Sequence, residues 1–190
     1  MKKALILVGL VLSLLPNLLF AQYANKDLVL LDSVDYRGLS DGDRQLIDSA
    51  FSVYHNAGHD TVRLKMLAML ADNLNDGQLW PRYNQLLYDE SMKLEQNKFD
   101  GSTWRRLLRF RCDAINNLGY VQYSKGNTGK ALEHWKAASK LQLSIGYENG
   151  YANTINNIGA VYDSHGKYDS ALVYYDICYE IELRLGDTAN

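Results

Sequence analysis

The stretch INNLGYVQYSKGNTGKAL, residues 115–132, returns forty residues later as INNIGAVYDSHGKYDSAL, residues 155–172. The similarity extends over residues 113–150 and 153–190, where eleven positions are identical. In the first copy they are Ile115, Asn116, Asn117, Gly119, Val121, Ser124, Gly126, Ala131, Leu132, Leu143 and Gly146. A repeat at a fixed period indicates a structural unit that stacks on its own copies, whereas a catalytic site does not need to occur twice.

Helical periodicity runs through most of the chain. Apolar residues recur at three- and four-residue spacing, and glycines separate the periodic segments. We expect helices at residues 43–55, 60–74, 78–96, 102–124, 128–145, 148–164 and 168–185. The separating glycines are Gly58, Gly77, Gly101, Gly126, Gly146 and Gly166. Residues 22–37 stay ambiguous, because DLVLLDSV fits a short helix or a strand.

The first 21 residues have the layout of a secretory signal peptide. Two lysines precede an apolar run over residues 4–15, and Pro16 and the small residue Ala21 follow. This run is shorter than the roughly 18 residues that a membrane-spanning helix needs, and no nearby cysteine supports a lipid anchor. We therefore expect cleavage after Ala21 and an exported chain, in the periplasm or another extracytoplasmic compartment.

The charge and the cysteine content limit the kinds of function that the sequence is compatible with. Loss of the first 21 residues removes two of the 20 basic residues and changes the formal net charge from −2 to −4. An acidic exported protein is a poor candidate for binding nucleic acid. Cys112 and Cys178 lie in different repeats and at different helical phases, so we expect two small buried thiols, although an oxidising compartment would permit a disulfide. The sequence indicates no cofactor.

The repeat resembles the tetratricopeptide repeat (TPR), whose signature combines a large residue, Leu-Gly and an aromatic residue with an alanine and an aromatic residue on the next helix. The corresponding residues are Ile115, Leu118, Gly119, Gln122, Ala131 and Trp135, then Ile155, Ile158, Gly159, Tyr162, Ala171 and Tyr175. The small glycines and alanines would let the helices approach, and the aromatic residues would fill the remaining volume. Gln122 departs from the signature, and no proline closes either unit, consistent with helices about one turn longer than in 34-residue repeats.

The recurring N-N-[LI]-[GA] motif is similar to the long-repeat branch of this family, which includes kinesin light chains. The LWPRYN element at residues 79–84 resembles bacterial extracytoplasmic sensor regions that precede kinase, cyclase or DNA-binding output domains. The resemblance implies an all-α superhelix, a TPR-like solenoid of antiparallel helix hairpins, and a protein–protein or peptide interaction module rather than an enzyme. Its expected parts are a segment at 22–59, degenerate TPR-like helices at 60–111 and repeats at 112–151 and 152–190.

In stacked helix hairpins, the first helices line a concave groove that is the usual binding surface. The side of each first helix opposite its buried stripe would face this groove. We expect this side to carry Asp113, Asn116, Asn117, Tyr120 and Tyr123, then Asn153, Asn156, Asn157 and Asp163. Asparagine amides offer a donor and an acceptor and can hold a peptide backbone, as the resemblance to long-repeat proteins implies. Alternatively, these amides are solvated or cap neighbouring helices.

The sequence GLSDG, residues 38–42, fits the G-x-S-x-G pattern of serine hydrolases. That nucleophile must follow a strand of a parallel sheet, and everything downstream here is helical. We interpret Ser40 as a helix N-cap, with Asp41 and Asp43 near the positive end of the helix. A small secreted hydrolase using Ser40 is therefore the rival function, and a purely structural scaffold is the third.

Two further clusters have simpler explanations. His55 and His59 would share a metal ion only on one helix, but Gly58 predicts a turn, so we expect no metal site. The arginines of STWRRLLRFR, residues 102–111, would form an anion site at the groove. The interpretation that we favour is a solvated stripe that pairs with acids such as Asp89 and Glu90.

The last expectation concerns the helix at residues 168–185. It would present Ala171, Tyr175, Cys178 and Ile181 along one stripe, with Leu172, Tyr179 and Leu183 beside it. Solenoids normally end in a helix with a polar outer face, and this helix has none. We therefore expect the sensor or scaffold part of a longer signalling protein, with more repeats, a membrane helix and an output domain downstream. Alone, the chain is expected to self-associate through this helix or to fray there.

Overall fold

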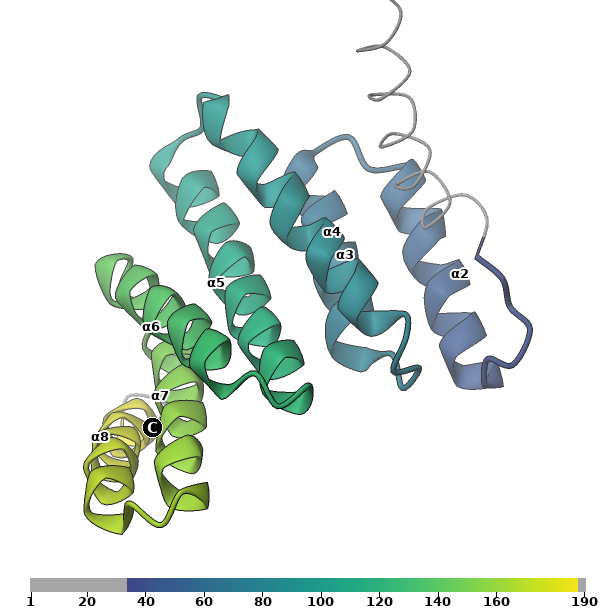
Figure 1. Cartoon of the computed structure of the whole chain (residues 1–190). Coiled ribbons are helices and arrows are strands. Elements are labelled where there is room, and N and C mark those ends of the chain that lie inside the picture. Colours follow the sequence, from purple (N-terminus) through teal and green to yellow (C-terminus); the bar gives the residue numbers. More distant parts are fainter. Residues whose placement is uncertain (1–33, 188–190) are drawn as a thin grey trace, which may run out of the picture. The chain divides into compact units, whose positions relative to one another are not determined.

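The computed structural model describes residues 34–187, which form helices and the segments that connect them (Figure 1). The described helices belong to the second of the two units into which the chain divides, and this unit begins at Asp41. No strand occurs within residues 34–187. None of the helices in this range is long and apolar enough to span a membrane. The predicted signal peptide and most of the ambiguous segment 22–37 lie outside the described residues.

The observed helices follow the predicted ones closely. They are α2 (Asp41–His55), α3 (Asp60–Asn73), α4 (Trp80–Lys93), α5 (Gly101–Ser124), α6 (Thr128–Ser144), α7 (Glu148–Ser164) and α8 (Tyr168–Asp187). A short 3-10 helix, η1 (Leu94–Gln96), extends α4. Helix α4 starts two residues later than expected, because the Asp76 side chain accepts hydrogen bonds from the backbone N–H groups of Gln78 and Leu79 and holds a turn there. Gly101 begins α5 instead of preceding it.

Consecutive helices of the second unit pack as antiparallel hairpins (Figure 1). The most extensive contacts join α5 with α6 and α7 with α8, and α3 packs on α4 in the same way. The first helices of successive hairpins also touch, because α3 contacts α5 and α5 contacts α7. The predicted all-α solenoid of helix hairpins is confirmed.

Three turns of this solenoid end in the same way. Gly126, Gly146 and Gly166 have φ angles of +78°, +66° and +69°, a left-handed conformation that glycine adopts without steric cost. After each glycine, the next backbone N–H reaches the carbonyl five residues back, as Asn127 does to Gln122 at 2.9 Å. This hydrogen bond defines a Schellman motif, which satisfies carbonyl groups at the helix end. The glycine positions predicted from the sequence are thus required by backbone conformation.

The signature glycines lie directly beneath aromatic rings of the facing helix. A Cβ atom at Gly119 would lie 2.5 Å from Nε1 of Trp135, and one at Gly159 would lie 2.9 Å from Cε1 of Tyr175. Trp135 is buried, and its Nε1 donates a hydrogen bond to the backbone oxygen of Asn116 at 3.0 Å. The prediction that aromatic residues fill the volume left by these glycines is therefore confirmed.

Two glycine-to-alanine substitutions test this packing. Gly119→Ala places a methyl group against the buried Trp135 ring, and overpacking of this kind typically costs about 1–3 kcal/mol. Gly129, in α6, has no atom within 4 Å of its added Cβ, so Gly129→Ala should gain helix propensity instead. Thermal unfolding followed by circular dichroism should show a lower melting temperature for the first variant and an unchanged or higher one for the second. Equal melting temperatures would contradict the observed glycine–tryptophan contact.

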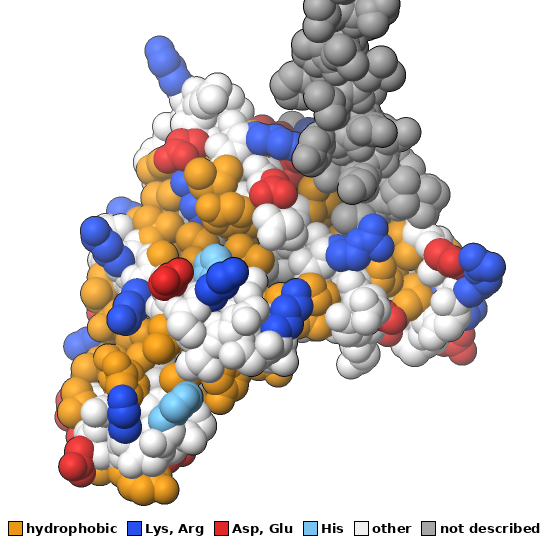
Figure 2. Space-filling model, in the orientation of Figure 1, with side chains coloured by type: hydrophobic (Ala, Val, Ile, Leu, Met, Phe, Trp, Pro, Cys, Tyr) orange, Lys and Arg blue, Asp and Glu red, His pale blue; other side chains and the backbone are white. Residues whose placement is uncertain are grey.

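Helix α8 buries one side and exposes another. Ala171, Cys178 and Ile181 are buried, and the cluster of Cys178 and Ile181 includes Ala152 and Ile155 of α7. Four large side chains on a different side are exposed, namely Tyr168, Leu172, Tyr179 and Leu183. Figure 2 shows hydrophobic side chains at the surface of the end that α7 and α8 form. The equivalent of Leu172 in the first repeat, Leu132, packs against the cluster between α6 and α7.

The two cysteines are both free and buried, as the sequence predicted. The pKa of the Cys112 thiol is raised to about 12, mainly because burial disfavours the thiolate and also because of the charge of Asp113. Cys178 donates a hydrogen bond from Sγ to the backbone oxygen of Ala152 at 3.3 Å. Both residues therefore act as small packing groups in the hairpin cores.

Candidate functional site

The nine residues predicted to face a groove divide into two sets. These nine residues lie on α5 and α7 and are together called the polar face. Tyr120, Asn153, Asn156 and Asp163 are exposed. Asp113, Asn116, Asn117, Tyr123 and Asn157 are partly buried. The exposed set is available to a ligand, whereas the partly buried set already contacts neighbouring helices, and those contacts decide what each residue can do.

Asn116 joins the first helices of the two repeats. Its side-chain oxygen accepts hydrogen bonds from Oγ1 of Thr154 and from Nδ2 of Asn157, both at 3.1 Å. Thr154 is fully buried, and its Oγ1 in turn accepts a hydrogen bond from Nε2 of Gln142 at 2.9 Å. This chain of hydrogen bonds connects α6, α7 and α5. Asn117 makes a similar link, donating from Nδ2 to Oδ1 of Asp72 on α3 at 3.2 Å.

The amides of Asn116 and Asn117 thus bond to side chains of neighbouring helices, which is neither the predicted peptide contact nor a helix cap. Removing one partner leaves a buried hydroxyl and an amide unsatisfied, which destabilises a fold. The sequence did not predict this role, because Thr154 and Gln142 are not signature positions.

Equivalent positions of the two repeats provide a matched pair of variants. Asn116→Ala should lower the stability by about 1–3 kcal/mol, because the buried Thr154 hydroxyl loses its acceptor. Asn156→Ala should leave the melting temperature within about a degree, since that side chain is exposed and makes no hydrogen bond within the described residues. Urea unfolding of both variants measures the difference. An Asn116→Ala variant as stable as the parent chain would remove the interhelical role of Asn116.

A second polar contact brings two carboxyl groups close to the polar face. The pKa of Asp113 is raised to about 7, mainly by burial and also by the charge of Asp72, while a hydrogen bond from Tyr147 and the charge of Arg109 oppose this shift. The Tyr147 hydroxyl lies 3.5 Å from Oδ2 of Asp113, and the guanidinium of Arg109 lies over the Tyr147 ring at 5.1 Å. Burial also raises the pKa of Asp72. Asp113 therefore gains a proton near neutral pH.

The raised pKa of Asp113 makes stability depend on pH. Between pH 4 and about 7, the folded chain keeps a proton that the unfolded chain releases, so stability falls as the pH rises through this range. Asp113→Asn removes this titration and should raise the melting temperature at pH 8 by a few degrees. Tyr147→Phe removes a hydrogen bond that lowers this pKa, so the fall should extend to higher pH. Melting curves of Asp113→Asn that follow the parent chain at every pH would contradict this assignment.

Aromatic residues form one end of the polar face. Tyr120 is 53% exposed, and its ring lies 6.1 Å from that of Trp80 at the start of α4. Tyr123 packs against Trp135, and its hydroxyl lies 3.4 Å from Oγ of Ser164 on α7. Trp80 belongs to a different hairpin, and the repeat pattern therefore does not place it on this face. The only feature of the sequence that pointed to a role for Trp80 was its place in the LWPRYN element.

The arginines of residues 102–111 do not form a single stripe. Arg111 is buried, where it donates to the backbone oxygen of Ser91 and lies 3.4 Å from Oε2 of Glu95. The prediction that Asp89 and Glu90 pair with these arginines was wrong, because Glu90 pairs with Lys93 and Asp89 accepts a hydrogen bond from Gln85. Arg105, Arg106 and Arg109 are exposed. A two-residue step rotates a helix by about 200°, so Arg109 and Arg111 lie on opposite sides of α5.

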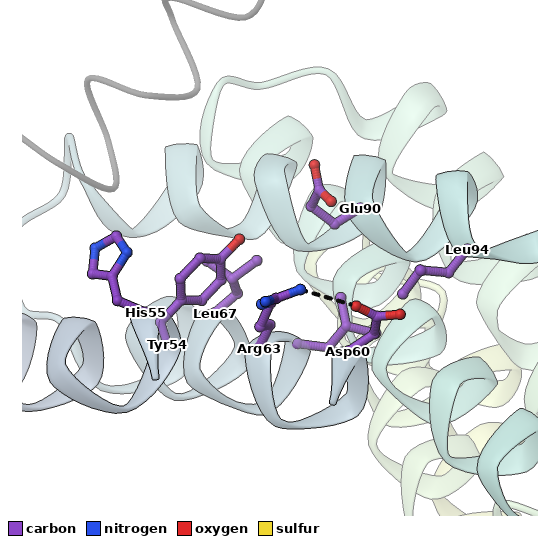
Figure 3. Close-up of a pocket in the computed structure, with 8 residues that line it drawn as sticks. Tyr54, His55, Asp60, Arg63, Leu67, Glu90 and Leu94 are labelled. Carbon is purple, nitrogen blue, oxygen red and sulfur yellow. Dashed lines mark hydrogen bonds and ion pairs between the residues drawn. The ribbon is translucent and has the colours of Figure 1, made fainter. Parts of the chain in front are cut away.

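The region around the two histidines forms a cavity of about 250 Å³ between α2, α3 and α4 (Figure 3). His55 lies at the end of α2, and Asp60 pairs with Arg63 at 3.2 Å. His59 precedes α3 and caps it, because its Nδ1 accepts a hydrogen bond from the backbone N–H of Thr61. The predicted turn at Gly58 is confirmed, and the histidines do not share a helix. The described part of the chain contains no group of three metal-binding side chains.

The surroundings of Ser40 do not match the hydrolase pattern. Residues 34–40 contain no strand, so the strand that must precede such a nucleophile is missing from this segment. Helix α2 begins at the next residue, and Asp41 and Asp43 lie in its first turn, as predicted. The buried carboxylate of Asp43 also accepts a hydrogen bond from the backbone N–H of Asn75 at 2.9 Å. Ser40 thus stands at a helix start.

Comparison with known proteins identifies the class of these hairpins. A family model for the tetratricopeptide repeat matches residues 110–181, from within α5 to within α8. Residues 110–181 are therefore tetratricopeptide repeats, and repeats of this kind are protein–protein interaction modules. No curated protein and no solved structure matches the chain.

Proposed function

We propose that the chain binds an extended segment of a partner protein along the exposed part of the polar face. The observation that carries this proposal is the set of unsatisfied amides on α7. Asn153 and Asn156 are exposed, lie almost one turn apart and make no side-chain hydrogen bond within the described residues. Each amide offers a donor and an acceptor to a peptide backbone. The two asparagines bind the backbone of the partner and do not select for its side chains.

The neighbouring residues give this surface its chemical character. Tyr120 and Trp80 offer aromatic rings that a partner side chain can cover. At the other end of α5, the exposed Arg105 and Arg106 have no acidic partner within the described residues. Such a surface fits a segment with an apolar side chain at one end and an acidic side chain at the other.

We further propose that binding takes place outside the cytoplasm. The lysine pair, the apolar run and Ala21 support export, since this is the composition of a secretory signal peptide. The likeness of LWPRYN to extracytoplasmic sensor regions supports a sensor role, in which binding of the partner produces a signal. Self-association through the exposed side of α8 stays a prediction.

A displayed random-peptide library, selected against the full chain, supplies a probe for this surface. The affinity of a selected peptide is then measured by fluorescence anisotropy. The double variant Asn153→Ala/Asn156→Ala should weaken binding about tenfold, because two hydrogen bonds to the peptide are lost. Tyr120→Ala should weaken it as well. Asn97→Ala, an exposed asparagine outside α5 and α7, is the matched control and should bind normally. Equal affinities for the double variant and the control would exclude the polar face as the binding surface.

A further inference from the structure

A cavity of about 420 Å³ lies between the end of α6, the start of α7 and the second half of α8. It is here called the α8 cavity, and its lining includes Leu143, Tyr147, Tyr151, Ile177 and Glu180. Tyr151 lies two residues from Asn153, a rotation of about 200° on the helix. The α8 cavity therefore opens on the side of α7 opposite the polar face. A partner can occupy it while the polar face is in use.

The lining of the α8 cavity is apolar and incompletely covered. Leu143 is 61% exposed and Ile177 is 37% exposed, although both are large aliphatic residues. Tyr147 and Tyr151 are only partly buried beside them. The volume falls within the range of roughly 300–1,000 Å³ that is typical of ligand pockets. It can accept one or two large side chains.

The rim of the α8 cavity is acidic. Glu148 pairs with Arg184 at 3.3 Å, which leaves Asp176 and Glu180 without an ionic partner within the described residues. These two carboxylates lie four residues apart on α8, where like charges repel. A cationic group placed between them relieves this repulsion.

We propose that the α8 cavity binds a partner-protein segment in which an aliphatic side chain stands next to lysine or arginine. The aliphatic side chain covers Leu143 and Ile177, and the cation lies between Asp176 and Glu180. Such a segment matches both the apolar lining and the charge of the rim. This site lies on the side of α7 opposite the polar face, and Tyr147, which lines it, also contacts Asp113 of that face.

The rim charge argues against two other occupants. In a symmetric dimer the same patch meets itself, so a second copy would bring another Asp176 and Glu180 to the contact. An anionic lipid surface would meet the same repulsion. A cationic, apolar peptide is the occupant whose charge complements the site.

Two fluorescent peptides test the proposal with the full chain. One contains leucines and lysines at helical spacing, and the other has glutamate in place of each lysine. The leucine–lysine peptide should bind more tightly in anisotropy titrations. Glu180→Lys should weaken its binding at least about tenfold and improve binding of the leucine–glutamate peptide. Glu182→Lys makes the same charge change at an exposed position about 200° away on α8, and should have little effect.

Ile177→Ser distinguishes insertion into the cavity from attraction to surface charge. The substitution is at a partly exposed residue, so the fold should persist, and affinity for the leucine–lysine peptide should fall. Unchanged affinity of this variant would overturn the proposal, because it would reduce the contact to charge alone. Equal loss in Glu180→Lys and Glu182→Lys would also overturn it. A dimer in sedimentation velocity that Ile177→Ser dissociates would assign the cavity to a second copy instead.

Discussion

The contact between a glycine and an aromatic ring fixes the spacing of both repeats. Trp135 can lie over α5 only because Gly119 has no side chain, and Tyr175 lies over α7 at Gly159 for the same reason. The Trp135 ring is held in place by its hydrogen bond to the backbone of Asn116. With the hairpin closed in this way, Ala131 and Trp135 form a core with Ile158 and Val161 of the next hairpin. Stacking of the repeats thus builds on the packing within each repeat.

Hydrogen bonds between hairpins fix the register that apolar packing alone does not determine. Apolar surfaces tolerate sliding, whereas a buried hydrogen bond requires a defined register. Gln142, Thr154 and Asn116 supply such a bond between successive hairpins, and Asn117 supplies another toward α3. The bonds from Gln142 through Thr154 to Asn116 also connect the two candidate binding surfaces, since Gln142 lines the α8 cavity and Asn116 belongs to the polar face. The first helices therefore take part in stacking and also carry the residues of the proposed polar-face site.

Periodic features of the fold could be predicted from the sequence, and features that depend on a neighbouring hairpin could not. Helix limits and turn glycines follow from local spacing, and the buried thiols from their helical phase. Asn116 and Asn156 occupy identical motif positions, yet one is hydrogen-bonded between helices and the other is exposed. Their difference arises from contacts with the next first helix, which no local pattern contains. The α8 cavity escaped prediction for the same reason, because three helices contribute its lining.

The turns at Gly126, Gly146 and Gly166 make the repeat a transferable unit of sequence. All three close with the same hydrogen bond and stand at equal intervals along the chain. If a cut at Gly126 were joined to a cut at Gly166, the junction would have the same local geometry as either original turn. Recombination within a gene could therefore add or delete one hairpin without creating a new kind of loop. An array of this kind can change length in evolution while every joint keeps its geometry.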